Sequence, residues 1–284
     1  MPYVAEISRA NPTCFLFLVD HSTSMTDPIL GAPGNPKKSQ FVADALNKVI
    51  QSLVVAASKD MDIRNYYQIG VLGYGFNVNP ILGGALTGQD LVWVDDLYKN
   101  PLRIEERIKK EPDGAGGYIE LTRKFPVWVE PVARGQTPMC AVLTRATEIL
   151  ANWVSEHPNA FPPTVINLTD GESNDGDPRK PAEALRALST TDGNVVLLTV
   201  HASSNQFAQQ IFFPPDDTQL PDRASRVMFE MSSPLTVRMM QTAQELLGLD
   251  LQGAGGSPRG IVYNADIAGI VQALEIGTRP ANMK

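Results

Sequence analysis

The chain alternates short, almost wholly apolar segments with longer segments in which apolar residues recur every three or four positions. Residues 15–19 form a continuous apolar run, which is typical of a strand buried on both faces. Residues 40–58 follow, and their apolar side chains repeat at helical spacing. Strands that alternate with helices are joined by right-handed crossovers, which align the strands in parallel. The sequence therefore predicts a Rossmann-like, doubly wound α/β fold, with a mainly parallel sheet and helices on both faces.

The same alternation continues along the chain, apart from two irregular stretches. We expect further strands at 67–74, 164–168, 194–200 and 260–263, and further helices at 138–154, 178–188, 234–247 and 266–276. The first irregular stretch, 77–134, is rich in Gly and Pro, and we expect short strands at 91–94 and 125–129 and a short helix at 102–110. The second, about 202–230, is expected to be rich in loops. We predict a single domain over 1–284, with a core from about 13 to 276.

Composition argues against several classes of protein. The formal net charge is -7 and Lys and Arg do not cluster, which disfavours binding to nucleic acid or to anionic lipid. No apolar run approaches the length that spans a bilayer, and residues 1–12 lack the pattern of a signal peptide. Cys14 and Cys140 are expected to lie far apart, as buried reduced thiols. These features together predict a cytoplasmic location.

Three short polar segments are expected to meet at one edge of this sheet. Asp20 closes the first strand and is followed by Ser22 and Ser24, while Asp170 closes a later strand and Thr137 lies in a turn between the two. In an open parallel sheet, ligands bind beyond the carboxyl ends of the central strands. Two carboxylates and three hydroxyls form an all-oxygen set that suits a hard divalent cation. We therefore predict a metal site at these five residues.

Each segment also has a purely structural explanation. A serine hydroxyl of the first segment could satisfy loop amides, and Thr137 followed by Pro138 could simply begin a helix. Asp170 followed by Gly171 is a common turn after a strand. The three segments together favour a shared site, because two buried strands each end in Asp on one edge with the Thr turn between them.

With these residues in view, the sequence resembles the von Willebrand factor A domain family. The resemblance rests on the family's metal-ion-dependent adhesion site, which has a D-x-S-x-S segment, a distal Thr and a T-D-G segment. These correspond here to residues 20–24, to Thr137 and to residues 169–171. Met25 extends the first segment to the D-x-S-x-S-M form that is common in bacterial members. In element order, the resemblance extends from residue 15 to about residue 276.

The resemblance implies a set of roles for these residues. Ser22, Ser24 and Thr137 would be direct or switching ligands of Mg²⁺ or Mn²⁺, and Asp20 and Asp170 would act largely through water. It further implies a protein partner that contributes an acidic side chain to the metal.

Other polar groups at the same edge are weaker candidates. His21 is expected to pack or to face solvent, because the alternation directs it away from the two serines. His201 ends a strand and is a candidate for the rim of the site. The acidic residues of 172–177 are expected to form a solvated loop and a helix cap.

The function expected from these residues is that of a non-enzymatic, Mg²⁺-dependent protein-interaction module. It would be an adaptor or regulator in a bacterial cytoplasmic complex or signalling system. Stand-alone bacterial members encoded beside AAA+ ATPases, or beside protein kinases and PP2C-type phosphatases, offer an analogy. One alternative is a metal-dependent phosphoester hydrolase of similar topology, although Ser22 stands where its second acid is required. Another is a degenerate scaffold that binds no metal.

Overall fold

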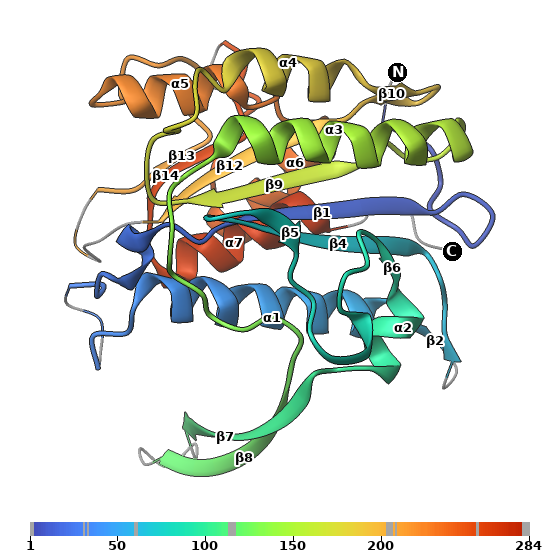
Figure 1. The fold of residues 1–284 in the computed structure, drawn as a ribbon, viewed down its shortest axis with the longest axis vertical. Coiled ribbons are helices and arrows are strands. Elements are labelled where there is room, and N and C mark those ends of the chain that lie inside the picture. The colour runs from blue at the N-terminus through green and yellow to red at the C-terminus, as the bar shows by residue number, and fades with distance from the viewer. Residues whose placement is uncertain are drawn as a thin grey trace.

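A central sheet with helices on both sides forms the body of the protein (Figure 1). The computed structural model describes residues 3–30, 32, 34–59, 62–112, 118–202, 207, 209–253 and 256–279. Within these residues the sheet has eight strands, in the order β13-β14-β12-β9-β1-β4-β5, with β6 paired to β4. The parallel strands are β1 (Thr13–Asp20), β4 (Tyr67–Tyr74), β9 (Thr164–Thr169), β12 (Val196–Ala202) and β14 (Ile261–Ala265). The antiparallel strands β5 (Val78–Pro80), β6 (Val92–Trp93) and β13 (Ile211–Phe212) add to them.

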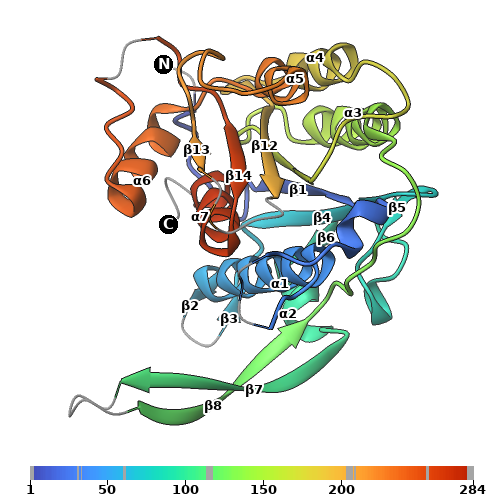
Figure 2. The same ribbon diagram turned by 90° about the vertical axis from the view of Figure 1, so that its left-hand side faces the viewer.

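The helices cover both faces of this sheet (Figures 1 and 2). On one face lie α1 (Lys38–Ala56), α6 (Val237–Leu247) and α7 (Ile267–Thr278), and on the other lie α3 (Met139–Glu156), α4 (Arg179–Ala187) and α5 (Arg223–Met231). The continuous apolar run in β1 serves both layers: Phe15 and Phe17 pack on the α1 side, and Leu16 and Leu18 on the α3 side. The predicted doubly wound α/β fold is confirmed.

The remaining regular elements are short. They are η1 (Thr23–Thr26), β2 (Ser58–Lys59), β3 (Asp62–Ile63), η2 (Gly84–Leu86), α2 (Val94–Lys99), β10 (Ser189–Thr190) and β11 (Gly193–Asn194). In the part of the chain that the structure describes, no helix combines the length and the apolar character needed to cross a membrane.

The irregular stretch before Thr137 contains a two-stranded antiparallel hairpin, β7 (Arg103–Pro112) with β8 (Tyr118–Val127), that projects away from the sheet (Figure 2). The helix expected at 102–110 is therefore wrong. Ile104 and Ile108 are four residues apart, and this spacing fits one face of a strand as well as one face of a helix. Pairing with β8 selects the strand, and the helix of this region is α2, which ends just before it.

The stretch at 202–230 is more regular than expected, in so far as it falls within the described residues. α5 begins there, because Asp222 and Ser225 form a capping box at its start. The helix expected at 234–247 begins at Val237, with the Thr236 hydroxyl as its cap. Ser233 lies just before the expected start, and its hydroxyl accepts the Leu197 amide proton of β12 at 2.9 Å.

The two cysteines are free thiols. Cys14 is buried in β1, as expected, and burial raises its pKa. Cys140 is only partly buried, at the start of α3, which corrects the expectation that both thiols would be buried.

Candidate metal-binding site

Asp20 is fixed at the end of β1 with both of its carboxylate oxygens already bonded. Its side chain is wholly buried. Oδ1 accepts the Ser22 amide proton at 2.7 Å, and Oδ2 accepts the Thr169 hydroxyl at 2.7 Å. Burial raises the pKa of Asp20 to about 6, the bonds from Ser22 and Thr169 oppose that rise, and the Asp170 charge adds to it. The carboxylate therefore orders the loop after β1 and couples it to β9.

Ser22, Ser24 and Asp170 bring their side-chain oxygens together although the serines lie 148 and 146 residues away from Asp170. The two serine hydroxyl oxygens are 3.0 Å apart. Asp170 Oδ1 lies 2.8 Å from Ser24 Oγ and 3.5 Å from Ser22 Oγ. Because β1 pairs with β9, the loops that follow the two strands are neighbours. The expected juxtaposition of these three residues is present, and their role as metal ligands stays a prediction.

Thr137 does not have the structural role that its position before Pro138 offered. Pro138 occupies the position before the first residue of α3, and no side-chain hydrogen bond caps the helix from there. Asp175 caps α3 instead, because its carboxylate accepts the amide protons of Cys140 and Ala141 at 2.9 Å each. Thr137 contributes its carbonyl, which accepts the Met139 and Asn174 amide protons. The explanation of Thr137 as a helix cap is therefore wrong, because the Thr137 hydroxyl does not cap α3.

The turn before Thr137 is held against the loop that carries the serines. The Thr23 amide and hydroxyl both donate to the Gly135 carbonyl at 3.1 Å, and the Arg134 amide donates to the His21 carbonyl. Gly135 has a φ of 105°, and a Cβ there would lie 2.5 Å from the Phe76 nitrogen. Only glycine fits, so the close approach of the two loops depends on it. Through the Asn174 amide, Thr137 is also bound to the loop that follows Asp170.

Lys38 is a component of the site that the residue pattern did not single out. It is the first residue of α1, and its ammonium lies 2.5 Å from Asp170 Oδ2 and 3.7 Å from Asp27 Oδ2. Its side chain is 4% exposed and that of Asp170 is 0% exposed. A clue was present in the sequence, since a cation at the start of a helix opposes the helix dipole and so points to another partner.

The two histidines at this edge are packed in place. His21 is buried against the backbone of Gly73 and Gly75, and burial, with Arg134 as second cause, lowers its pKa to about 4. His201 stacks on the Tyr263 ring at 4.7 Å, and burial lowers its pKa as well. Both are therefore neutral at pH 7.

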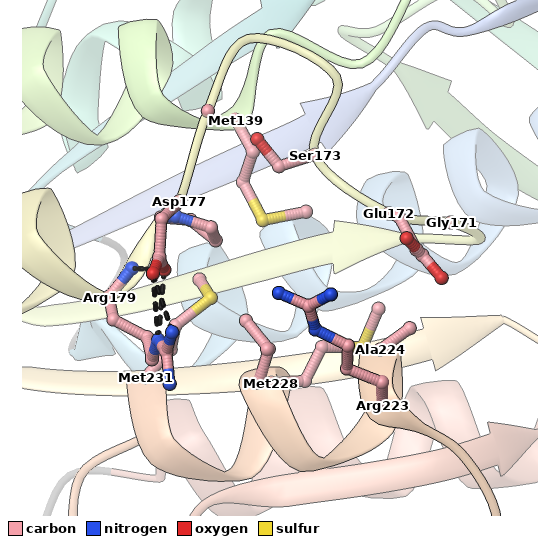
Figure 3. Close-up of a pocket in the computed structure, with 13 residues that line it drawn as sticks. Met139, Gly171, Glu172, Ser173, Asp177, Arg179, Arg223, Ala224, Met228 and Met231 are labelled. Carbon is pink, nitrogen blue, oxygen red and sulfur yellow. Dashed lines mark hydrogen bonds and ion pairs between the residues drawn. The ribbon is translucent and has the colours of Figure 1, made fainter.

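A cavity of about 250 Å³ opens beside the loop that follows Asp170 (Figure 3). Gly171 and Glu172 form part of its wall, and α5 supplies apolar side chains that include Met228 and Met231. Figure 3 shows Arg223 directed into this space, while Arg179 is paired with Asp177. The cavity could not be expected from the sequence pattern, because α5 itself was not.

The donor set fits a hard divalent cation. Octahedral Mg²⁺ with oxygen ligands at 2.0–2.1 Å separates neighbouring ligand oxygens by about 2.9 Å. The three oxygen separations among Ser22, Ser24 and Asp170, 2.8 to 3.5 Å, are close to that value. Within the described residues, no group of three or more His, Cys, Asp or Glu side chains could hold a metal. A metal at this edge would therefore depend on hydroxyl ligands.

Comparison with known proteins gives no family. No family model and no curated protein matches the chain. A crystal structure of the ArnB paralog VWA2 from Sulfolobus acidocaldarius is 13% identical, with a TM-score of 0.33 over 70% of this chain and 36% of that one. The three N-terminal domains of the type V pili tip protein Mfa5 from Porphyromonas gingivalis are 13% identical, with a TM-score of 0.32 over 57% and 20%. The match thus spans about a third and a fifth of those chains. At these scores we draw nothing from the likeness, and the fold is assigned from the sheet and its helices.

Proposed function

We propose that this protein is a Mg²⁺- or Mn²⁺-dependent protein-interaction module of the von Willebrand factor A type. Ser22, Ser24 and Thr137 would hold the metal, with Asp20 and Asp170 assisting. The observation that carries the proposal is the convergence of the two serines and Asp170 within 3.5 Å, from loops far apart in the sequence. When bound, the metal would supply a Lewis-acid position for a carboxylate of the partner.

The role of Asp175 adds support. Since Asp175 caps α3, the helix does not require the Thr137 hydroxyl, and that hydroxyl is available to a ligand. The backbone bonds of the Thr137 turn to Thr23 on one side and to Asn174 on the other keep it between the two acidic loops. This is the position that a third ligand-bearing loop requires.

The surroundings of Asp20 favour binding over catalysis. A phosphoester hydrolase of this topology would use the Asp that closes the first strand as its nucleophile. Here that carboxylate is wholly buried, with one oxygen bonded to Ser22 and the other to Thr169. An attack on a substrate would break both bonds, so the protein is better suited to ordering a loop than to covalent chemistry.

The partner surface would include the cavity beside Asp170. An acidic residue of the partner at the metal would lie next to an apolar depression formed by α5, into which Arg223 is directed. Phe76, which is 78% exposed and adjoins the Gly135 turn, offers an apolar contact on another side. We place the protein in a cytoplasmic regulatory complex, by analogy with stand-alone members of the family encoded beside ATPases or kinase and phosphatase pairs.

Affinity purification from a bacterial extract, with Mg²⁺ or with EDTA, tests this function. Wild-type protein should retain a partner in Mg²⁺ and lose it in EDTA, and Ser24→Ala should fail to retain it. Ser52→Ala is the matched control, because the exposed Ser52 hydroxyl bonds only to the Lys48 carbonyl of the same helix. Equal recovery under all conditions would contradict the proposal. Calorimetry that detects no Mg²⁺ or Mn²⁺ binding would favour the metal-free scaffold.

A further inference from the structure

The Lys38 ammonium is a buried positive charge placed directly on the candidate metal site. It makes a 2.5 Å contact with Asp170 Oδ2, and neither side chain is more than 4% exposed. Burying an ammonium carries a large desolvation cost unless a carboxylate compensates for it. The Asp170 carboxylate is the close partner that meets this requirement.

The start of α1 gives no other reason for a lysine at this position. Cations are unfavourable at the N-terminus of a helix, and the first turn of α1 contains no acidic residue that would offset Lys38. Lys37, its neighbour, is exposed, so two adjacent lysines have opposite environments. The burial of Lys38 thus arises from the site and not from the helix.

With Lys38 in place, Asp170 has a full set of partners. Oδ1 accepts from Ser24 and, at longer range, from Ser22, while Oδ2 accepts from Lys38. A divalent cation bound among these oxygens would lie beside the ammonium and share the same carboxylate with it. Two positive charges this close repel strongly in a buried site.

Asp27 offers the ammonium a second position. Its Oδ2 lies 3.7 Å from Lys38 Nζ, and its side chain is 59% exposed. The Lys38 amide donates to the Asp27 carbonyl at 3.0 Å, which fixes the backbone of the two residues together. Asp27 is thus a second, more exposed carboxylate within ion-pair distance of the ammonium.

We infer that Lys38 competes with the metal for the Asp170 carboxylate. The Lys38 ammonium balances the Asp170 charge when no divalent cation is bound. It withdraws toward Asp27 and solvent when a cation binds. This inference rests on the proposed function. The competition weakens metal binding, and a partner carboxylate that completes the metal's coordination then favours the form in which Lys38 has withdrawn. Metal and partner would thus bind cooperatively.

Calorimetric titration with MgCl₂ provides the first test, with wild-type protein, Lys38→Met and Lys37→Met. The Lys37 variant is the matched control, since it removes the same charge from an exposed position. Lys38→Met should bind Mg²⁺ at least ten times more tightly than wild type, and Lys37→Met should match wild type. Equal or weaker binding by Lys38→Met overturns the inference and leaves the proposed function standing. An absence of Mg²⁺ binding in all three proteins overturns both.

A second measurement uses the wild-type protein and so does not depend on the folding of a variant. The amines are acetylated with an N-hydroxysuccinimide ester, and the modification of each lysine is followed by fragmentation mass spectrometry. Without metal, Lys38 should react much more slowly than Lys37. Saturating Mg²⁺ should raise the Lys38 rate several-fold and leave the Lys37 rate unchanged. A Lys38 that stays protected in Mg²⁺ overturns the inference.

Discussion

Replacing Asn47 by alanine is expected to lower the free energy of unfolding by about 3–5 kcal/mol. Asn47 lies on the buried face of α1 and binds the chain as it returns from the β7–β8 hairpin. Its Oδ1 accepts the amide protons of Trp128 at 2.8 Å and Val129 at 3.0 Å, and its Nδ2 donates to the Val129 carbonyl at 2.9 Å. One side chain thus satisfies three buried backbone groups.

The magnitude follows from these three groups. A buried donor or acceptor that loses its partner costs about 1–3 kcal/mol. Three such groups would give a loss of about 3–9 kcal/mol. Water that enters the vacated space restores some of the hydrogen bonds, so the expected loss lies in the lower half of that range. Alanine favours helix over asparagine by only about 0.5 kcal/mol, which does not offset the loss.

Urea unfolding followed by tryptophan fluorescence and by circular dichroism measures the change. Asn77→Ala is the matched control, because Asn77 is exposed in the loop after β4. Its free energy of unfolding should change by less than about 0.5 kcal/mol. A loss below about 1 kcal/mol in Asn47→Ala, or an equal loss in both variants, would refute the assignment of Asn47 as the anchor of this segment.

Three further predictions concern the surroundings of the site. At Gly73 a Cβ would lie 2.4 Å from the His21 ring and 2.7 Å from Ile81, so Gly73→Ala should lower the free energy of unfolding by about 1–3 kcal/mol. Gly171→Ala is the control and should leave the melting temperature unchanged, because a Cβ at Gly171 would have no atom within 4 Å. Burial lowers the pKa of His21 to about 4, so below pH 6.5 the unfolded chain binds a proton that the folded chain does not. His21 should therefore account for a decrease of about 2 kcal/mol in the free energy of unfolding between pH 7 and pH 5. Denaturant unfolding at several pH values measures this decrease, and a His21→Leu variant with the wild-type pH dependence would contradict the prediction. Asp175→Ala should cost about 1–2 kcal/mol through the lost cap of α3, and Asp175→Asn should recover most of it in thermal melts; equal melts for the two variants would show that the cap is unimportant.

The fold could be predicted because a strand that is buried on both faces appears in the sequence as a continuous apolar run. The apolar run in β1 must be apolar at every position, since alternate side chains face α1 and α3. The sequence allowed a hairpin or a functional surface in this stretch, but the position of the hairpin strands could not be predicted in this way. Its residues are mostly polar, and Ile104 and Ile108 fit a helix and a strand equally well, so only the pairing with β8 decides.

The polar loops show a similar division. The proximity of Ser22, Ser24 and Asp170 follows from strand order, which the alternation of elements predicts. Lys38 and Asp175 could not be found from strand order, because their roles depend on where a side chain points after the helices have packed. Asp175 binds a helix that begins 36 residues before it, and no local pattern indicates such a contact.

The order of the strands also bears on when the two acidic loops can meet during synthesis. β1 lies between β4 and β9, so one edge of the first strand waits until residues 164–169 have left the ribosome. Until then the Asp20 loop has no Thr169 to hold it and no Asp170 to face. Closing so long a segment makes this pairing a late step in folding. A nascent or truncated chain that ends before residue 169 would expose the apolar edge of β1 and would be a natural substrate for chaperones.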